Sequence, residues 1–330
     1  EFGPDGDQDI IKCGSYTGNG STTGPVIDLG FEPQWLLVKN TSAARPWIML
    51  DTMRGTTVGT SNAGSDEFLL ANASDAEDTD SYLSINSTGF QLRDIGGNVN
   101  ASNENYIYMA IRRGPLAQPE SGTEVFASYI AGQGASDPAL VSGFVTDFAT
   151  RMYRGGGIEQ MLASRLQGGK YLETSNTAVE QSAGLDWDYQ TGWYDGLGNS
   201  LFMSHMWKRA PGFCDVVSYT GDGTGSSGSG RAVSHNLGVA PEMMWVKQRN
   251  VSGEDWWVYH SGLDATAPED YNLILNGTNA KSGVTGAWAR TPPTSAAFFL
   301  DQSPVNVSNG TFIAYLFATL PGVSKVGSFS

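Results

Sequence analysis

The fold is decided by two nearly identical words, SYTGNG at residues 15–20 and SYTGDG at residues 218–223. A weaker copy, SYIAGQG, occupies residues 128–134. Self-similarity at a long spacing indicates that one structural unit recurs along the chain. Each copy leads from β-forming residues into glycines, which is typical of a strand that ends in a turn.

Other segments match in the same order outward from these words. LGFEPQWLLVKN at residues 29–40 corresponds to LGVAPEMMWVKQ at residues 237–248, and we align Trp47 with Trp257. Closing strands, each followed shortly by a proline, are expected at residues 106–111, 201–206 and 311–316. Three equivalent ends predict three domains.

The composition favours strands over helices. The chain has 330 residues with 42 glycines, only 16% charged residues and 11% aromatic residues. Short apolar segments alternate with clusters of Gly, Asn, Ser and Asp, which predicts an all-β fold of antiparallel β-sandwich or jelly-roll domains. A short helical rhythm is expected at residues 157–166.

The repeats give the expected domain boundaries. We predict β-sandwich repeat 1 at residues 1–116, a linker at 117–124 and a divergent β-sandwich repeat 2 at 125–212. β-sandwich repeat 3 is expected at 213–323 and the start of a further repeat strand at 324–330.

These words resemble a family of tandem repeat domains in virion and tail-fibre proteins of tailed phages, common in marine and cyanobacterial phages. The resemblance is carried by SYTGNG, by the LGxxP turn before WLLVKN or MMWVKQ, and by the endings NYIYMAIRRGPL and KRAPGF. It spans most of the chain and is weakest in the middle repeat. It implies lectin-like, concanavalin-type jelly rolls and a structural or host-binding role on the particle, with no defined active site to carry over.

The titratable residues do not indicate an enzyme. Of three histidines, none stands in a spaced metal motif or beside a nucleophile signature, and we expect His235 to form hydrogen bonds in a loop or core. Asp5, Asp7 and Asp9 alternate but lack calcium-loop spacing, because residue 10 is Ile and residue 16 is Tyr. These residues and the acidic residues around Asp78 and Asp80 are expected to be solvated. We therefore predict no catalytic residues, no cofactor and no metal. The two cysteines are expected to be free and buried.

Aromatic residues are the one feature with binding potential, because flat apolar rings stack on sugars. Trp187, Trp193 and Tyr194 form one cluster in the sequence, and Trp256 is a further candidate. Because neighbouring strand residues face opposite ways, Trp256 is expected to point outward if Trp257 points into the core. A neighbouring domain or subunit is its expected partner, and a sugar ring is the second.

These features predict a structural or adhesin component of a phage particle, located on the virion surface or an appendage. Its expected partners are further copies of itself, other virion proteins and host surface glycans. A net charge of −15 argues against nucleic acid, and the apolar runs are too short to insert in a membrane. Two alternatives stay open, a carbohydrate-binding lectin domain of a cell-surface adhesin and a polysaccharide depolymerase.

Overall fold

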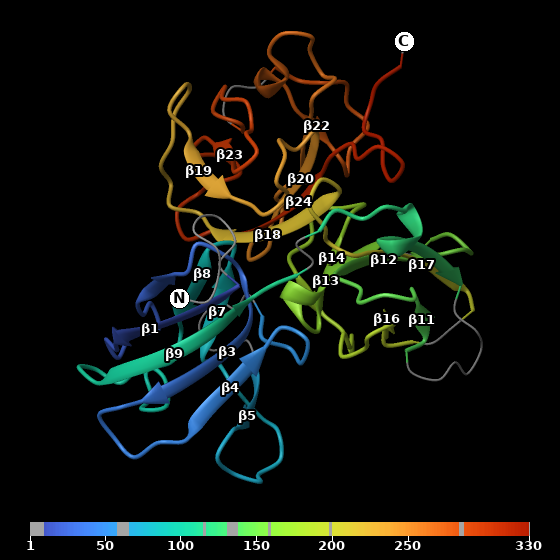
Figure 1. Ribbon diagram of the computed structural model, residues 1–330. Coiled ribbons are helices and arrows are strands. Elements are labelled where there is room, and N and C mark those ends of the chain that lie inside the picture. The colour runs from blue at the N-terminus through green and yellow to red at the C-terminus, as the bar shows by residue number, and fades with distance from the viewer. Residues whose placement is uncertain are drawn as a thin grey trace. The chain divides into compact units, whose positions relative to one another are not determined.

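The computed structural model confirms the all-β class (Figure 1). In the part of the chain that it describes, antiparallel strands are joined by loops and three short 3-10 helices, with no α-helix among them. The described residues are 10–57, 66–114, 117–130, 138–157, 160–197, 200–283 and 287–329.

The chain divides into two compact units. Unit 1 comprises Glu1–Gly114 and Arg165–Gly168, and unit 2 comprises Pro115–Ser164 and Gly169–Ser330. Apart from Arg165–Gly168, the second and third of the three domains expected from the sequence therefore share unit 2.

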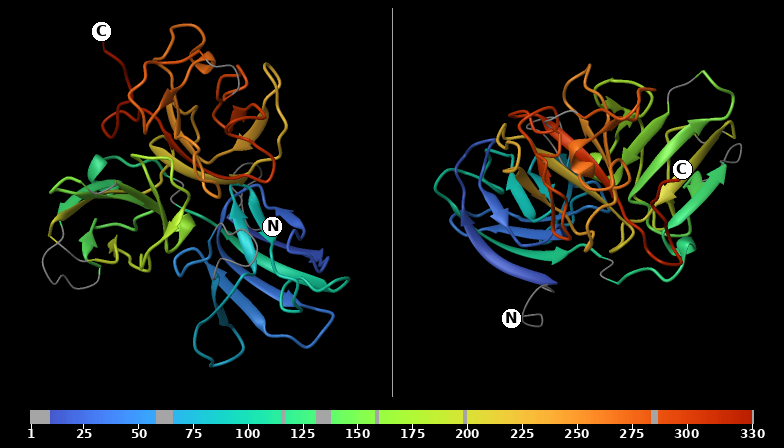
Figure 2. Two further views of the ribbon diagram at one scale, coloured as in Figure 1. Left: turned by 180° about the vertical axis from the view of Figure 1, so that it is seen from behind. Right: turned by 90° about the horizontal axis from the view of Figure 1, so that it is seen from above.

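Unit 1 contains a six-stranded antiparallel sheet, called here the first sheet, and a three-stranded sheet. Apolar side chains of both sheets form its core, including Leu36, Val38, Ile48 and Phe90. The closing strand β9 lies beside β1 in the views of Figure 2. The first sheet has the order β1(Ile11–Thr17), β9(Asn105–Arg112), β3(Pro33–Asn40), β4(Trp47–Asp51), β5(Asp66–Leu70) and β6(Asp78–Asp80), and the smaller sheet has β2(Val26–Asp28), β8(Gly89–Leu92) and β7(Leu83–Asn86).

Unit 2 contains two large sheets, called here the middle sheet and the third sheet, each with a two-stranded companion. The middle sheet has the order β10(Phe126–Ile130), β17(Phe202–Trp207), β12(Phe148–Tyr153), β13(Met161–Ser164), β14(Lys170–Glu173) and β15(Gln181–Ser182), with β11(Leu140–Val141) paired to β16(Gly192–Trp193). The third sheet has the order β18(Cys214–Thr220), β24(Thr311–Phe317), β20(Met243–Gln248), β21(Trp257–His260) and β22(Leu273–Ile274), with β19(Arg231–Ser234) paired to β23(Ala297–Leu300).

All three large sheets follow one strand order. In each, the opening strand pairs with the closing strand, and the closing strand pairs with the strand after the Gly/Pro turn. The second strand of each repeat leaves for the smaller sheet. This order explains why the opening and closing words recur together, because they are hydrogen-bonded partners at opposite ends of each repeat.

Two local expectations are wrong. The helical rhythm expected at residues 157–166 is mainly strand β13, Met161–Ser164, with all four residues buried, and only its last two residues are helical, in the 3-10 helix η2(Arg165–Gln167); residues 158 and 159 lie outside the described ranges. A strand covered on both faces shows no alternation, so its apolar run imitates a helix. The middle copy of SYTG is also out of register, because Tyr129 pairs with Ser204 and is 37% exposed, whereas Tyr16 pairs with Tyr106 and is buried.

Candidate functional site

The recurring SYTG word forms the same buried arrangement in the first and third repeats. The Tyr16 hydroxyl donates to Val99 O at 2.7 Å, and its ring stacks on Tyr106 with centroids 5.0 Å apart. Tyr219 donates to Val305 O at 2.7 Å and stacks on Phe312 at 5.1 Å. Each tyrosine fastens the opening strand to the segment before the closing strand.

The glycines and amides of the word complete this arrangement. A Cβ on Gly18 would lie 2.3 Å from Ala101 O, and one on Gly221 would lie 2.1 Å from Val307 O, so only glycine fits. Asn100 Nδ2 donates to Asn19 Oδ1 at 3.2 Å. In the third repeat, Asn306 Nδ2 donates to Asp222 Oδ1 at 2.9 Å. The most conspicuous words of the sequence therefore serve folding.

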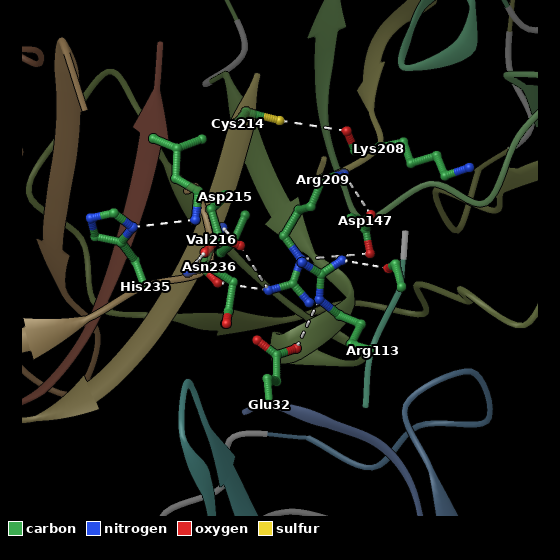
Figure 3. A network of polar contacts seen from close by, with 12 residues as sticks. Glu32, Arg113, Asp147, Lys208, Arg209, Cys214, Asp215, Val216, His235 and Asn236 are labelled. Atoms are coloured by element: carbon green, nitrogen blue, oxygen red, sulfur yellow. Dashed lines mark hydrogen bonds and ion pairs between the residues drawn. The ribbon is translucent and has the colours of Figure 1, made fainter. Parts of the chain in front are cut away.

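A network of buried polar contacts surrounds Arg209, which is 2% exposed (Figure 3). Its guanidinium lies 3.7 Å from Asp147 Oδ1 and 3.4 Å from Asp215 Oδ1, and Nη1 donates to Val216 O at 2.7 Å. Its backbone N–H donates to Asp147 Oδ2 at 2.7 Å. Since Asp147 precedes the middle sheet's β12 and Asp215 lies in the third sheet's β18, Arg209 joins the two repeats through one buried cation.

His235 lies beside this network (Figure 3), and the hydrogen bonds of its two ring nitrogens fit a neutral ring. Nδ1 accepts the Leu237 N–H at 3.2 Å, and Nε2 lies 3.1 Å from Thr294 O, which requires the proton on Nε2. Burial lowers the pKa of His235, against the opposing effect of Asp215. The predicted hydrogen-bonding role of His235 is confirmed.

The same type of acid–arginine pair occurs in unit 1. Arg113 Nε lies 3.4 Å from Glu32 Oε1, and Glu32 is 3% exposed. Glu32 precedes β3 as Asp147 precedes β12, and Arg113 follows β9 as Arg209 follows β17. The RRGP and KRAP words thus supply a structural arginine after the closing strand.

The predicted aromatic cluster is real, but two of its rings are inside the middle repeat. Trp187 and Trp193 stack with centroids 4.8 Å apart, are 5% and 0% exposed, and belong to one apolar core. Trp193 Nε1 donates to Ser204 Oγ at 3.1 Å. Tyr194 is half-buried beside Asp186. The structure therefore corrects the glycan-stacking role of Trp187 and Trp193, because both rings are covered by core side chains.

Trp256 is also buried, at 0% exposure, and its Nε1 donates to Glu173 O of the middle repeat at 2.8 Å. Its expected partner, a neighbouring domain, is confirmed, whereas a ring that is fully covered offers no face to a sugar. Trp257 packs partly buried against the core of the third repeat, as expected.

The expected alignment of Trp257 with Trp47 is wrong by one residue. In the first sheet, Trp47 pairs with Lys39 and Ile48 pairs with the residue before Lys39. In the same register of the third sheet, Val246 pairs with Trp257, so Trp257 matches Ile48. Trp256, one residue earlier, therefore matches Trp47. Two capping contacts agree: Trp47 N donates to Asn72 Oδ1, and Trp256 N donates to Asn276 Oδ1, both at 2.8 Å. The shared tryptophan thus belongs to the outer face of the sheet and not to the core.

Around Trp256, the middle and third repeats are joined by residues that the sequence did not single out. Arg249 forms a two-pronged ion pair with Glu180, at 2.7 Å from Nε to Oε1 and 3.0 Å from Nη2 to Oε2. The rings of Phe148 and Tyr315 lie 5.3 Å apart, and Tyr315 hydrogen-bonds with Ser164. The one feature of the sequence that indicated this interface was the expectation that Trp256 points away from the core of its own repeat.

The remaining candidate groups have local roles. His260 Nδ1 accepts the Gly262 N–H at 2.8 Å, and the His205 ring packs beside the rings of Phe126 and Trp207. Within the described ranges, no group of three or more His, Cys, Asp or Glu residues is placed to hold a metal ion. No helix there is long and apolar enough to cross a membrane. Both cysteines are free as expected, but Cys13 is exposed and Cys214 alone is buried.

Fold and site together define an all-β repeat protein whose recurring residues close and join its repeats. The chain belongs to the family described as a domain of unknown function, DUF7483, which matches residues 8–115 and 200–330. The unmatched stretch covers most of the middle repeat, the one whose words are weakest. No curated protein and no solved structure matches the chain.

Proposed function

We propose that this protein is a structural or adhesin component of a tailed-phage particle, such as a tail fibre or surface appendage. In this proposal its three repeats are tandem lectin-like jelly rolls that act as spacers and assembly surfaces rather than as an enzyme. Host glycans are a secondary partner.

The observation that carries the proposal is the way the recurring words are used. Tyr16, Tyr219 and Arg209 fasten strands or join repeats, and the acidic partners of Arg209 are buried with it. The recurring residues thus close each repeat and join one repeat to the next. This use fits a structural protein built from repeats in a row. The resemblance of these words to phage virion repeats supplies the location.

The test is whether the protein is present in purified particles. Mass spectrometry of gradient-purified phage, with immunogold labelling by an antibody raised against this chain, should detect it at a fixed copy number on the tail or capsid surface. Absence from particles that carry its gene would overturn the proposal. Binding on a glycan array without incorporation would point to a lectin, and release of reducing ends from host polysaccharide would point to a depolymerase.

A further inference from the structure

The outer face of the first sheet, the one turned away from the core of unit 1, is apolar and open. It carries Trp35, Leu37, Trp47, Met49, Ile107 and Met109, all half-buried or exposed. Leu37 pairs with both Met49 and Met109, so these three side chains lie in one row across three strands. Ile107, in the neighbouring row between Ser15 and Lys39, is 42% exposed. A contiguous apolar patch of this kind marks an interaction surface.

The matching face of the third sheet shows what such a face does in this chain. By strand register, Ile107 matches Ile313, Met109 matches Tyr315 and Trp47 matches Trp256. The three residues of the third sheet are all 0% exposed. Positions that are open in one repeat are therefore closed in the other.

The third sheet's face is covered by the corresponding face of the middle sheet. Ala149, Ala163 and Met206 point into the core of the middle repeat, so Phe148 and Ser164, their strand neighbours, point outward. Phe148 packs on Tyr315, and Ser164 hydrogen-bonds with it. The chain thus packs one outer face against another outer face of the same strand order.

We propose that the outer face of the first sheet binds the same face of a second copy of this chain, forming a two-fold dimer. Within one chain, the outer faces of the middle and third sheets already pack on each other. The open face of the first sheet can therefore pair with a like face only on another copy of the chain, where the first sheet is open too. A face that binds itself gives a closed dimer. Lys39 does not oppose this contact, because its Nζ donates to Arg45 O at 2.6 Å within the same unit.

This inference deepens the assembly role proposed above. It rests on that role in one respect, that several copies of the chain come together. The experiment uses the purified full chain, so that failure to dimerise and absence from particles are separate results. Sedimentation velocity over a wide concentration range should show a monomer–dimer equilibrium. Ile107→Glu should shift the dissociation constant upward by at least a hundredfold. Ile95→Glu is the matched control, since Ile95 is 61% exposed in the same unit but outside the sheet, and it should leave the dimer unchanged.

Two results would overturn the inference: a wild-type chain that stays monomeric throughout, or an Ile107→Glu chain that dimerises as the wild type does. Circular dichroism shows whether the variant is folded, and Ile107→Arg supplies a second charge if Glu disturbs the strand. A nitroxide on exposed Cys13, which pairs with Met109 on this face, gives an independent readout. One spin–spin distance between copies is expected for a two-fold dimer, whereas a series of distances would indicate an open array and reject the proposal.

Discussion

The first and third sheets have the same strand order and matching residues, yet they differ in what covers them. Along β9 the burial alternates, with Tyr106, Tyr108 and Ala110 buried and Ile107 exposed. Along β24 every residue from Thr311 to Leu316 is buried. The difference teaches that alternation reports the surroundings of a sheet and not its fold.

The lysine pair shows how strongly the surroundings act. Lys39 is part-exposed in β3, whereas its equivalent, Lys247 in β20, is 0% exposed and donates from Nζ to Gln248 O at 2.9 Å. Burial lowers the pKa of Lys247, against the opposing effects of Glu254 and Asp255. One sequence position is therefore a surface cation in one repeat and a buried hydrogen-bond donor in another.

The largest expected contrast is between the two connectors. Residues 117–124 are mostly exposed, whereas Arg209, Ala210, Phe213 and Cys214 in the connector between the middle and third repeats are all at most 7% exposed. Limited proteolysis should cut within 117–124 and spare 208–214, because a protease needs exposed, locally unfolded chain. Mass spectrometry of the early fragments identifies the sites.

The two compact units are therefore expected to separate at residues 117–124. A first cut at 208–214 would show that the middle and third repeats separate easily, and it would undo the argument from the buried Arg209 network. Resistance at 117–124 under conditions that digest a denatured control would indicate a protected connector instead.

The next contrast is between the two equivalent tryptophans. Trp256→Ala should destabilise unit 2 by about 3–5 kcal/mol, as for other fully buried aromatics. Trp47→Ala, at the half-buried equivalent position, should cost the monomer about 1 kcal/mol or less. Chemical denaturation of each variant, measured at a concentration where the chain is monomeric, gives the two free energies of unfolding.

Trp257→Ala is the third member of this series, since Trp257 packs against the core of the third repeat. It should also be destabilising. Near-native stability of Trp256→Ala would mean that the middle repeat adapts to its loss, and equal costs at Trp47 and Trp256 would show that the open face of the first sheet is covered in solution.

Sequence reasoning succeeded where a residue acts within its own repeat. The all-β class and the hydrogen-bonding role of His235 both follow from local words. It failed where neighbours decide the outcome. The alignment of Trp47 slipped by one residue because both Trp256 and Trp257 were available and identity alone favoured neither. Trp187 and Trp193 looked like a binding surface because sequence clustering does not reveal which rings stack inside a core.

A third contrast concerns buried charge. Asp66 in β5 is 2% exposed and accepts N–H bonds from Thr57 at 3.2 Å and Leu83 at 2.9 Å. Asp270, at the corresponding sequence distance before β22 in unit 2, lies in the 3-10 helix η3(Pro268–Asp270) and has a side chain that is 37% exposed. Burial raises the pKa of Asp66 to about 7, although these hydrogen bonds act in the opposite direction. Because the folded-state pKa lies above the unfolded value of 3.8, the native state binds the proton more tightly.

The stability of unit 1 should therefore be highest below about pH 4 with respect to this group and fall as the pH rises towards 7. Each unit of pKa difference is worth about 1.4 kcal/mol, so the fall amounts to a few kcal/mol. Asp66→Asn should flatten this dependence, whereas Asp270→Asn should not change the pH profile of unit 1. Calorimetric melting between pH 4 and 8 follows both, and an unchanged slope in Asp66→Asn would assign the pH dependence to another group.

The smallest effect is expected where the two repeats are alike. Tyr16 and Tyr219 are each 8% exposed, and each donates its hydroxyl proton to a carbonyl at 2.7 Å. Burial raises the pKa of both phenols, so both remain neutral donors at physiological pH.

Removing the hydroxyl by Tyr→Phe deletes one buried hydrogen bond and leaves the ring stacking in place, which should cost about 1 kcal/mol in either repeat. The two losses should be equal within error, because both contacts lie inside their own repeat and neither depends on the covered outer face. Separate calorimetric transitions for the two units would measure them. A much larger cost for Tyr219→Phe would mean that the interface with the middle repeat also stabilises the SYTG turn, and the covered and open sheets would then differ in their cores as well as on their surfaces.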